Sequence, residues 1–147
     1  MSCTEGDTDH NIKIEINIRK QYKNMRSHFT ILEYLGISML VAKREYLFAC
    51  KLMALMMRHE IAMRDVYDIH FFAKNNWDID TEVLQIKTNK KTVQYLQECI
   101  EYIEKIKNNQ ILQGLGELLS PKEKLWVKKY LIDDTIFMLR NYISIFK

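Results

Sequence analysis

The sequence KLMALMMRHEIAMRDVYDIHFF, residues 51–72, decides the fold because it sets charged residues at helical spacing among apolar ones. If Lys51 lies on a helix, the residues three and four positions away from it are apolar: Leu47, Phe48, Ala54 and Leu55. Asp65 and Asp68, three residues apart, share one face of a following helix. Because charges among core side chains need partners or a ligand, we expect these three residues to converge where the two helices pack.

The composition of the whole chain agrees with a helical protein. Of its 147 residues, 48% are hydrophobic and 28% are charged, and four glycines and one proline leave room for long uninterrupted elements. The net charge of +3 is too mild to argue for a nucleic-acid-binding surface. Hydrophobic periodicity predicts helices over residues 44–58, 63–75, 80–88, 91–107 and 121–145.

The start of the last predicted helix has the clearest boundary signal in the sequence. Ser120 offers a hydroxyl N-cap, Pro121 fits the first helical position, and Glu123 completes a capping box. The chain before it is broken by Gly114 and Gly116.

The first part of the chain predicts a small sheet of two or three strands. Residues 12–18, IKIEINI, alternate strictly between isoleucine and polar residues, as in a half-buried strand. Residues 29–42 are rich in β-branched and aromatic side chains around Gly36, which indicates a turn or bulge. We therefore expect a single α+β domain, mostly α-helical, with the following parts: a flexible start at 1–10, a sheet region at 11–42 and a helical region at 43–147.

Cysteine use and hydropathy indicate a cytoplasmic, soluble protein. Cys3, Cys50 and Cys99 form an odd set without metal-binding spacing, which fits free thiols in a reducing compartment. The longest apolar run, residues 34–42, is about half of the ~20 residues that a membrane-spanning helix needs.

Residues 51–72 also carry a family resemblance. They resemble the K-x-x-A-L-x-x-R … R-D-x-Y-D-x-x-F segment of AbiEii/AbiGii-type nucleotidyltransferase toxins. The strand pattern at 12–18 is similar to the family's preceding sheet strand, and residues 109–142 resemble its C-terminal helical region. The resemblance covers about residues 10–145.

This resemblance implies an enzyme of a type IV toxin–antitoxin or abortive-infection system. Complete members transfer a nucleotide from an NTP, with Mg²⁺, to an acceptor that is tRNA for some of them, and a separately encoded antitoxin is the usual partner. The family also uses a Gly-Ser turn and an Asp-x-Asp pair, but this sequence contains no Gly-Ser dipeptide. Asp7 and Asp9 have the Asp-x-Asp spacing without an upstream strand or helix to position them.

The chain therefore resembles the C-terminal portion of such an enzyme. We expect it to be inactive alone and to need no cofactor by itself. An open sheet edge would be covered by the missing half, by a partner or by self-association.

The resemblance also implies roles for particular residues. Lys51 would be the catalytic cation that faces the phosphates, and Asp65 and Asp68 would orient Lys51 or the acceptor. Lys51, Arg58 and Arg64 would bind the nucleotide. Glu15, on the polar face of the strand at 12–18, is the candidate third carboxylate of a Mg²⁺ site.

Each of these residues also has a structural interpretation. Lys51 and the two aspartates would then form an ion network that fixes the register of two helices. Arg64 and Asp68 have the i,i+4 spacing of a helix-surface ion pair, and Arg58 fits a solvated helix end. Glu15 needs no special role on an exposed strand face.

Two functions without catalysis remain open from the sequence. One is an interaction module that binds a partner through its methionine-rich helix or an open sheet edge. The other is a purely structural helical domain.

Overall fold

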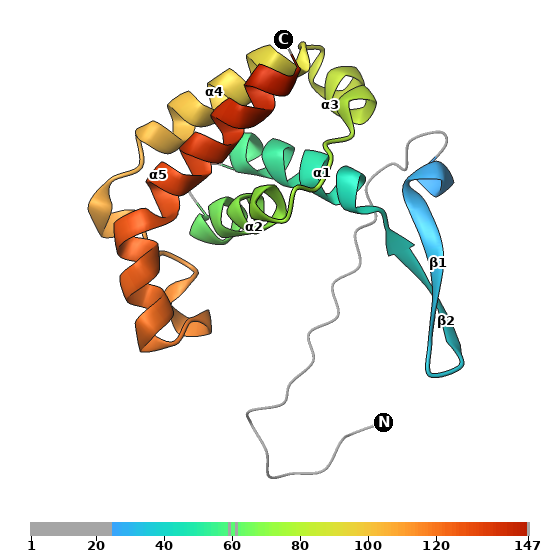
Figure 1. The fold of residues 1–147 in the computed structure, drawn as a ribbon, viewed down its shortest axis with the longest axis horizontal. Helices are drawn as coiled ribbons and strands as arrows, with labels where there is room; N and C mark the ends of the chain where they lie inside the picture. Colours follow the sequence, from blue (N-terminus) through green and yellow to red (C-terminus); the bar gives the residue numbers. More distant parts are fainter. Residues whose placement is uncertain (1–24, 59, 61, 147) are drawn as a thin grey trace.

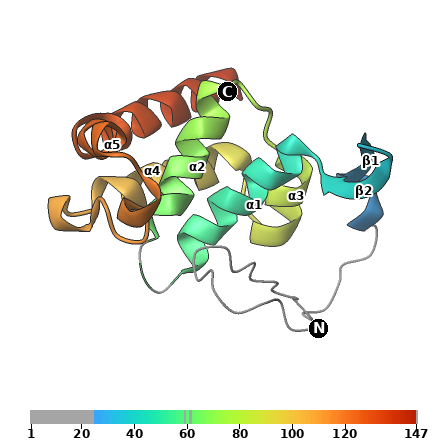
Figure 2. The ribbon, with the colours of Figure 1, turned by 90° about the horizontal axis from the view of Figure 1, so that it is seen from below.

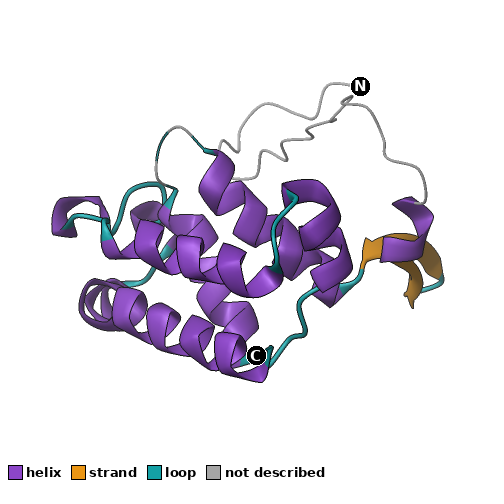
Figure 3. Cartoon of the chain, turned by 90° about the horizontal axis from the view of Figure 1, so that it is seen from above, coloured by secondary structure: helices purple, strands orange, loops and turns teal. Residues whose placement is uncertain are grey.

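The computed structural model describes residues 25–58, 60 and 62–146. The strand predicted at 12–18, including Glu15, and the flexible start predicted at 1–10 lie outside these residues. Figure 1 shows a helical body from which a β-hairpin projects, and Figure 3 shows the strands confined to one end. The predicted α+β fold, mostly helical with a small sheet, is confirmed.

The hairpin comes first in the described part of the chain. Strand β1 (Phe29–Tyr34) pairs antiparallel with β2 (Ile37–Ala42), in a register that runs from Phe29↔Ala42 to Tyr34↔Ile37. The turn residues Leu35 and Gly36 have φ angles of 50° and 77°. Positive φ at both central positions suits the twist of a two-residue hairpin, so the turn predicted at Gly36 is confirmed.

The hairpin buries little apolar surface within the described residues. Ile31 and Leu32 point to opposite faces of the strand, yet they are 70% and 51% exposed. Its other exposed large hydrophobic residues are Tyr34, Leu35, Ile37, Met39 and Leu40. Neither face of this two-stranded sheet is therefore covered by the part of the chain that the structure describes.

The helices begin and end close to their predicted bounds. Within the described residues they are α1 (Arg44–Met57), α2 (Met63–Lys74), α3 (Thr81–Thr88), α4 (Thr92–Glu104) and α5 (Pro121–Ile145). Helix α4 stops three residues before the predicted end at residue 107, because the Lys105 amide bonds the Tyr102 carbonyl and tightens the last turn. No helix in the described ranges combines the length and apolarity needed to cross a bilayer.

The helical body forms around α1 and α5. Helix α5 packs against α2 and α4, while α1 packs against α2, α3 and α4. Figures 1 and 2 show α5 lying across the bundle and α1 between α2 and α3. All five helices α1 to α5 contribute to the most buried large side chains, which include Phe48, Leu52, Ile69, Leu84, Leu96, Ile100, Leu131 and Leu139. The core thus joins segments that are far apart in the sequence.

An aromatic cluster ties the turn after α2 to the first and last helices. Trp77 stacks on Phe72 with ring centroids 4.3 Å apart, and Tyr142 donates a hydrogen bond to the Trp77 carbonyl at 2.6 Å. Phe48 of α1 meets the rings of both Phe72 and Tyr142 edge-on at 5.6 Å. This cluster fixes the direction in which the chain leaves α2.

The predicted capping box at the start of α5 is confirmed. The Glu123 amide donates to Ser120 Oγ at 3.4 Å, and the Glu123 carboxylate accepts from the Ser120 amide at 2.9 Å and its hydroxyl at 2.6 Å. The hydrogen bonds from the Ser120 side chain and backbone hold the pKa of Glu123 below its ordinary 4.5. The carboxylate's part of the box is therefore strongest while Glu123 is ionised, whereas the bond from the Glu123 amide to the Ser120 hydroxyl does not depend on that charge.

We predict that Ser120→Ala lowers Tm by about 3 °C, the usual effect of losing an N-cap hydroxyl in a chain of this size. Because the folded pKa of Glu123 is depressed, the carboxylate's share of the cap is present above pH 4.5 and is lost as pH falls through the folded pKa. The Tm difference should shrink accordingly in acid. Ser144→Ala, in the last turn of α5, is the matched control and should change Tm much less. Equal shifts for both variants would contradict the cap's role.

Candidate functional site

The end of α1 and the start of α2 bring the predicted catalytic residues together. Lys51 lies in the second half of α1, and a short link, residues 58–62, leads to Asp65 and Asp68 in the first two turns of α2. Lys51 Nζ lies 2.6 Å from Asp68 Oδ2 and 3.2 Å from Asp65 Oδ1. The predicted convergence of the three side chains is therefore present. An ammonium has three N–H donors, so one remains after these two contacts.

Asp65 is the buried member of this cluster. Its side chain is 0% exposed, whereas Lys51 and Asp68 are 31% and 37% exposed. The second Asp65 oxygen, Oδ2, accepts from Arg58 Nε at 2.5 Å. Asp65 also lies in the first turn of α2, where the helix dipole favours a negative charge. Two cations and a helix N-terminus together make burial of this carboxylate tolerable.

The charge state of Lys51 follows from these neighbours. Burial lowers the pKa of its ammonium, but the hydrogen bonds and charges of Asp68 and Asp65 outweigh burial and hold the pKa above its ordinary 10.5. Lys51 is therefore a cation at neutral pH. It suits stabilisation of a negative charge, and it does not suit the role of a general base.

The structural interpretation of Arg64 is wrong, and that of Arg58 is incomplete. No ion pair joins Arg64 to Asp68 in the described part of the chain, because Asp68 is taken by Lys51 on the other helix. Arg58 is an exposed residue at the end of α1, as that interpretation expects, but its guanidinium also bonds Asp65. A contact between helices has displaced the pairing expected from spacing on one helix.

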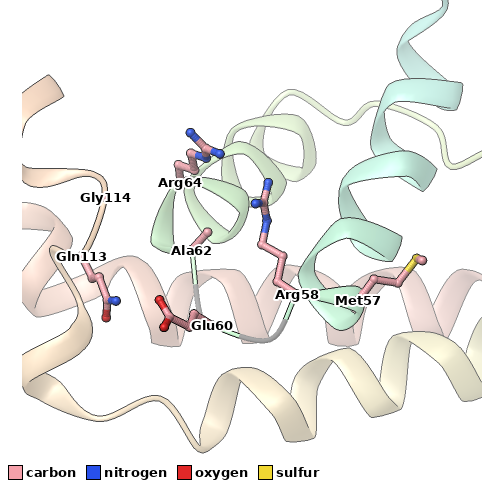
Figure 4. A pocket seen from close by; sticks show the side chains of 7 residues that line it. All are labelled: Met57, Arg58, Glu60, Ala62, Arg64, Gln113 and Gly114. Carbon is pink, nitrogen blue, oxygen red and sulfur yellow. The ribbon is translucent and has the colours of Figure 1, made fainter. Parts of the chain in front are cut away.

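A cavity of about 480 Å³ adjoins this cluster at the α1–α2 link. Its lining residues, shown in Figure 4, are Met57, Arg58, Glu60, Ala62, Arg64, Gln113 and Gly114. Gln113 and Gly114 come from the segment between α4 and α5, and the sequence pattern did not indicate them as site residues. Only the glycine hinted at an unusual backbone there, and its φ is +67°. Arg58 belongs both to the cavity, which it lines, and to the Lys51 cluster, because it bonds Asp65.

The described residues do not offer a magnesium site. They contain no group of three or more His, Cys, Asp or Glu side chains placed to hold a metal. Both oxygens of Asp65 are bonded to cations, and one oxygen of Asp68 is bonded to Lys51. Glu15, the predicted metal ligand, lies outside the described residues.

We predict that Asp65→Asn lowers the free energy of unfolding by about 3 kcal/mol, because it leaves two cations beside a buried neutral group. Asp68→Asn removes a more exposed partner of Lys51 and should cost about 1 kcal/mol or less. Asp133→Asn, at an exposed position of α5, is the control and should change stability by at most about 0.5 kcal/mol. Denaturant titration measures all three. Equal costs for the Asp65 and Asp68 variants would refute the ranking.

Comparison with known proteins identifies the family. The family model described as "Nucleotidyl transferase AbiEii toxin, Type IV TA system" matches residues 1–126 of the 147. No curated protein and no solved structure matches the chain. The matched range contains the hairpin, the Lys51 cluster and the cavity. The resemblance carried by residues 51–72 is thereby confirmed, and the chain belongs to the AbiEii nucleotidyltransferase toxin family of type IV toxin–antitoxin systems.

Proposed function

We propose that the chain supplies the Lys51–Asp65–Asp68 part of a Mg²⁺-dependent nucleotidyltransferase that transfers a nucleotide from an NTP to an acceptor such as tRNA. The observation that carries this proposal is the Lys51 ammonium, held charged between two carboxylates with one donor left over. Such a cation stabilises the negative charge that moves toward the leaving pyrophosphate in phosphoryl transfer. Its family membership makes an antitoxin the expected partner.

The two aspartates have different roles around Lys51. Asp65 is buried and bonded to both Lys51 and Arg58, so it fixes the position of the ammonium. Asp68 is more exposed and holds Lys51 from the solvent side, where it can also orient an acceptor group. Because the catalytic geometry depends on Asp65 through Lys51, Asp65 is a positioning residue.

The sequence contains no Gly-Ser dipeptide of the kind that the family uses to hold a triphosphate, and the described residues contain no group of three or more His, Cys, Asp or Glu side chains for a magnesium ion. We therefore propose that transfer requires a phosphate-binding half in addition to this cluster. Glu15 stays a candidate metal ligand of the complete enzyme. The cytoplasm is the proposed site of action, where both NTP and RNA acceptors occur.

A second candidate function is supported by the hairpin. Its apolar side chains are exposed on both faces among the described residues, which is the pattern of a protein-binding surface. A non-catalytic interaction module would use this surface without needing Lys51. Loss of the Lys51 charge should therefore impair the catalytic function and leave the interaction function intact.

The catalytic proposal predicts no labelled-nucleotide incorporation when the purified chain is mixed with Mg²⁺, RNA and each NTP. Fusion to the Gly-Ser and Asp-x-Asp half of another family member should give incorporation into RNA. In that fusion, Lys51→Met should reduce incorporation at least ~100-fold, the scale of losing one charge-stabilising group. Melting should change little, since Arg58 still neutralises Asp65.

Lys128→Met, at an exposed position on α5, is the matched control and should leave incorporation unchanged. Incorporation by the purified chain alone would refute its dependence on a second half. Full activity of the Lys51→Met fusion would instead refute the catalytic role and favour the interaction module.

The exposed hairpin also predicts association of the purified chain. Ile31 and Leu40 are paired across the strands and are 70% and 63% exposed. Leu40→Glu should shift the chain toward the monomer in sedimentation velocity, because it places a charge on the apolar sheet face. Leu125→Glu is the control, because Leu125 is on α5 and 71% exposed, and it should not shift the chain toward the monomer. A wild-type chain that stays ~18 kDa at high micromolar concentration would contradict association.

A further inference from the structure

His70 is a buried titratable residue that belongs neither to the Lys51 cluster nor to the cavity. It lies on α2, and its side chain is only 6% exposed. Asp134 of α5 is its carboxylate neighbour, but His70 Nε2 and Asp134 Oδ2 are 4.0 Å apart, which is too far for a hydrogen bond. A buried imidazole without a bonded anion is more stable neutral than charged.

The His70 ring packs against the indole of Trp126 where α2 meets α5. The ring centroids are 4.9 Å apart and the ring planes are inclined at 56°. Helix α5 packs against α2, as Figure 2 shows, and it carries both Trp126 and Asp134, about two helical turns apart. His70 thus has an apolar neighbour that suits its neutral form and an anionic neighbour that suits its charged form.

Burial and two charges determine which form of His70 prevails. Burial is the largest effect and lowers the pKa of His70 below its ordinary 6.5, the charge of Asp134 raises this pKa, and the charge of Lys74 on α2 lowers it. Helix α1, which also packs against α2, contributes no charge to this balance. His70 is therefore neutral at neutral pH and takes up a proton only in acid.

Helix α2 connects His70 to the Lys51 cluster. Asp68 lies two residues before His70 and bonds Lys51 of α1, and Asp65 bonds Lys51 from the first turn of the same helix. The contact between His70 and Trp126 joins α2 to α5 instead. Helix α2 is therefore held by ion pairs to α1 and by a titratable contact to α5, so a change at His70 acts on the helix that positions both aspartates.

We propose that His70 is a proton-sensitive contact between α2 and α5 that weakens in acid. In the neutral form, the ring stays buried against Trp126. The imidazolium formed by proton uptake needs an anionic partner, and the half-exposed carboxylate of Asp134 is within reach of a small movement of the ring. The ring then moves from Trp126 toward Asp134 and solvent. Helix α2 packs less tightly on α5 as a result, and the Lys51 cluster loses part of its support.

The effect of this contact on stability has a definite sign. A group whose folded pKa is lowered contributes stability that is present above its unfolded pKa, here 6.5, and is lost as pH falls through the folded pKa. The wild-type chain should therefore lose Tm between about pH 7.5 and about pH 5. His70→Gln should lose less Tm over the same range, because its side chain does not titrate.

NMR titration of the histidine Cε1–H resonances in the full chain measures proton uptake directly. The sequence has four histidines, and the resonance that His70→Gln lacks belongs to His70. Its midpoint should lie below 6.5. Asp134→Asn should lower this midpoint further and Lys74→Gln should raise it, each by up to about half a pH unit, the scale of one partly exposed charge. Opposite shifts show that the two charges act on the ring.

The fluorescence of Trp126 tests whether the ring moves. The sequence has two tryptophans, so Trp77→Phe leaves Trp126 as the only indole. Its emission should change with the same midpoint as the His70 resonance, and it should stay constant over that pH range when His70→Gln is added. His28→Gln is the matched control, because His28 pairs with Asp80 rather than with a residue of α5, and it should keep the transition.

Circular dichroism melting at neutral pH should show that all variants fold. Asp134→Asn and Lys74→Gln change solvent-accessible side chains, so they test the proposal independently of any packing effect of His70→Gln. A His70 midpoint at or above 6.5, shifts of the same sign in these two variants, or Trp126 emission that does not follow His70 would overturn the inference. None of these measurements requires nucleotide transfer, so the inference and the proposed function can fail separately.

Discussion

Burial of the Asp65 carboxylate constrains how the helical body and its candidate site are arranged. A carboxylate with no exposed surface must be matched by cations, and here Lys51 and Arg58 approach it from the end of α1. Since Asp65 belongs to the first turn of α2, this requirement fixes how α1 and α2 meet. The same contacts hold Lys51 charged and place Arg58 at the wall of the adjoining cavity.

The rest of the fold supports that junction from both sides. Helix α5 packs along α2, and the aromatic cluster of Phe48, Phe72, Trp77 and Tyr142 ties the far end of α2 to α1 and α5. Helix α2 is thus held at its start by charges and at its end by rings. The hairpin contributes little to this body, since most of its apolar side chains stay exposed among the described residues. The buried core and the exposed apolar surface of the hairpin therefore lie in different parts of the described chain.

Most of the fold and part of the site could be predicted from the sequence, for physical reasons that also explain the errors. Helices show their 3.6-residue periodicity locally, and the Gly36 turn and Ser120 cap are signalled by single residues. Lys51, Asp65 and Asp68 could be predicted to lie close together, because the apolar helix faces that bear them must pack against each other. The contacts of Arg64 and Arg58 could not be predicted, because an ion pair within one helix contributes little stability and is easily replaced by a contact between helices. Gln113 reaches the cavity through an irregular segment whose path no periodic pattern encodes.

The charge balance differs between the two cationic positions, Lys51 and Arg64. Lys51 has two carboxylate partners, so adding a phosphate to its remaining donor places a third negative group beside one ammonium. Such an arrangement binds a ground-state phosphate weakly, but it can stabilise additional charge that develops during transfer. Arg64 has no carboxylate partner among the described residues and stands near the start of α2, so its charge is less balanced than that of Lys51. The Arg58 side chain connects the two positions, because it contacts the carboxylate that holds Lys51 while it lines the cavity beside Arg64. A ligand that draws on Arg58 therefore alters the electrostatic environment of Asp65, and through Asp65 that of Lys51.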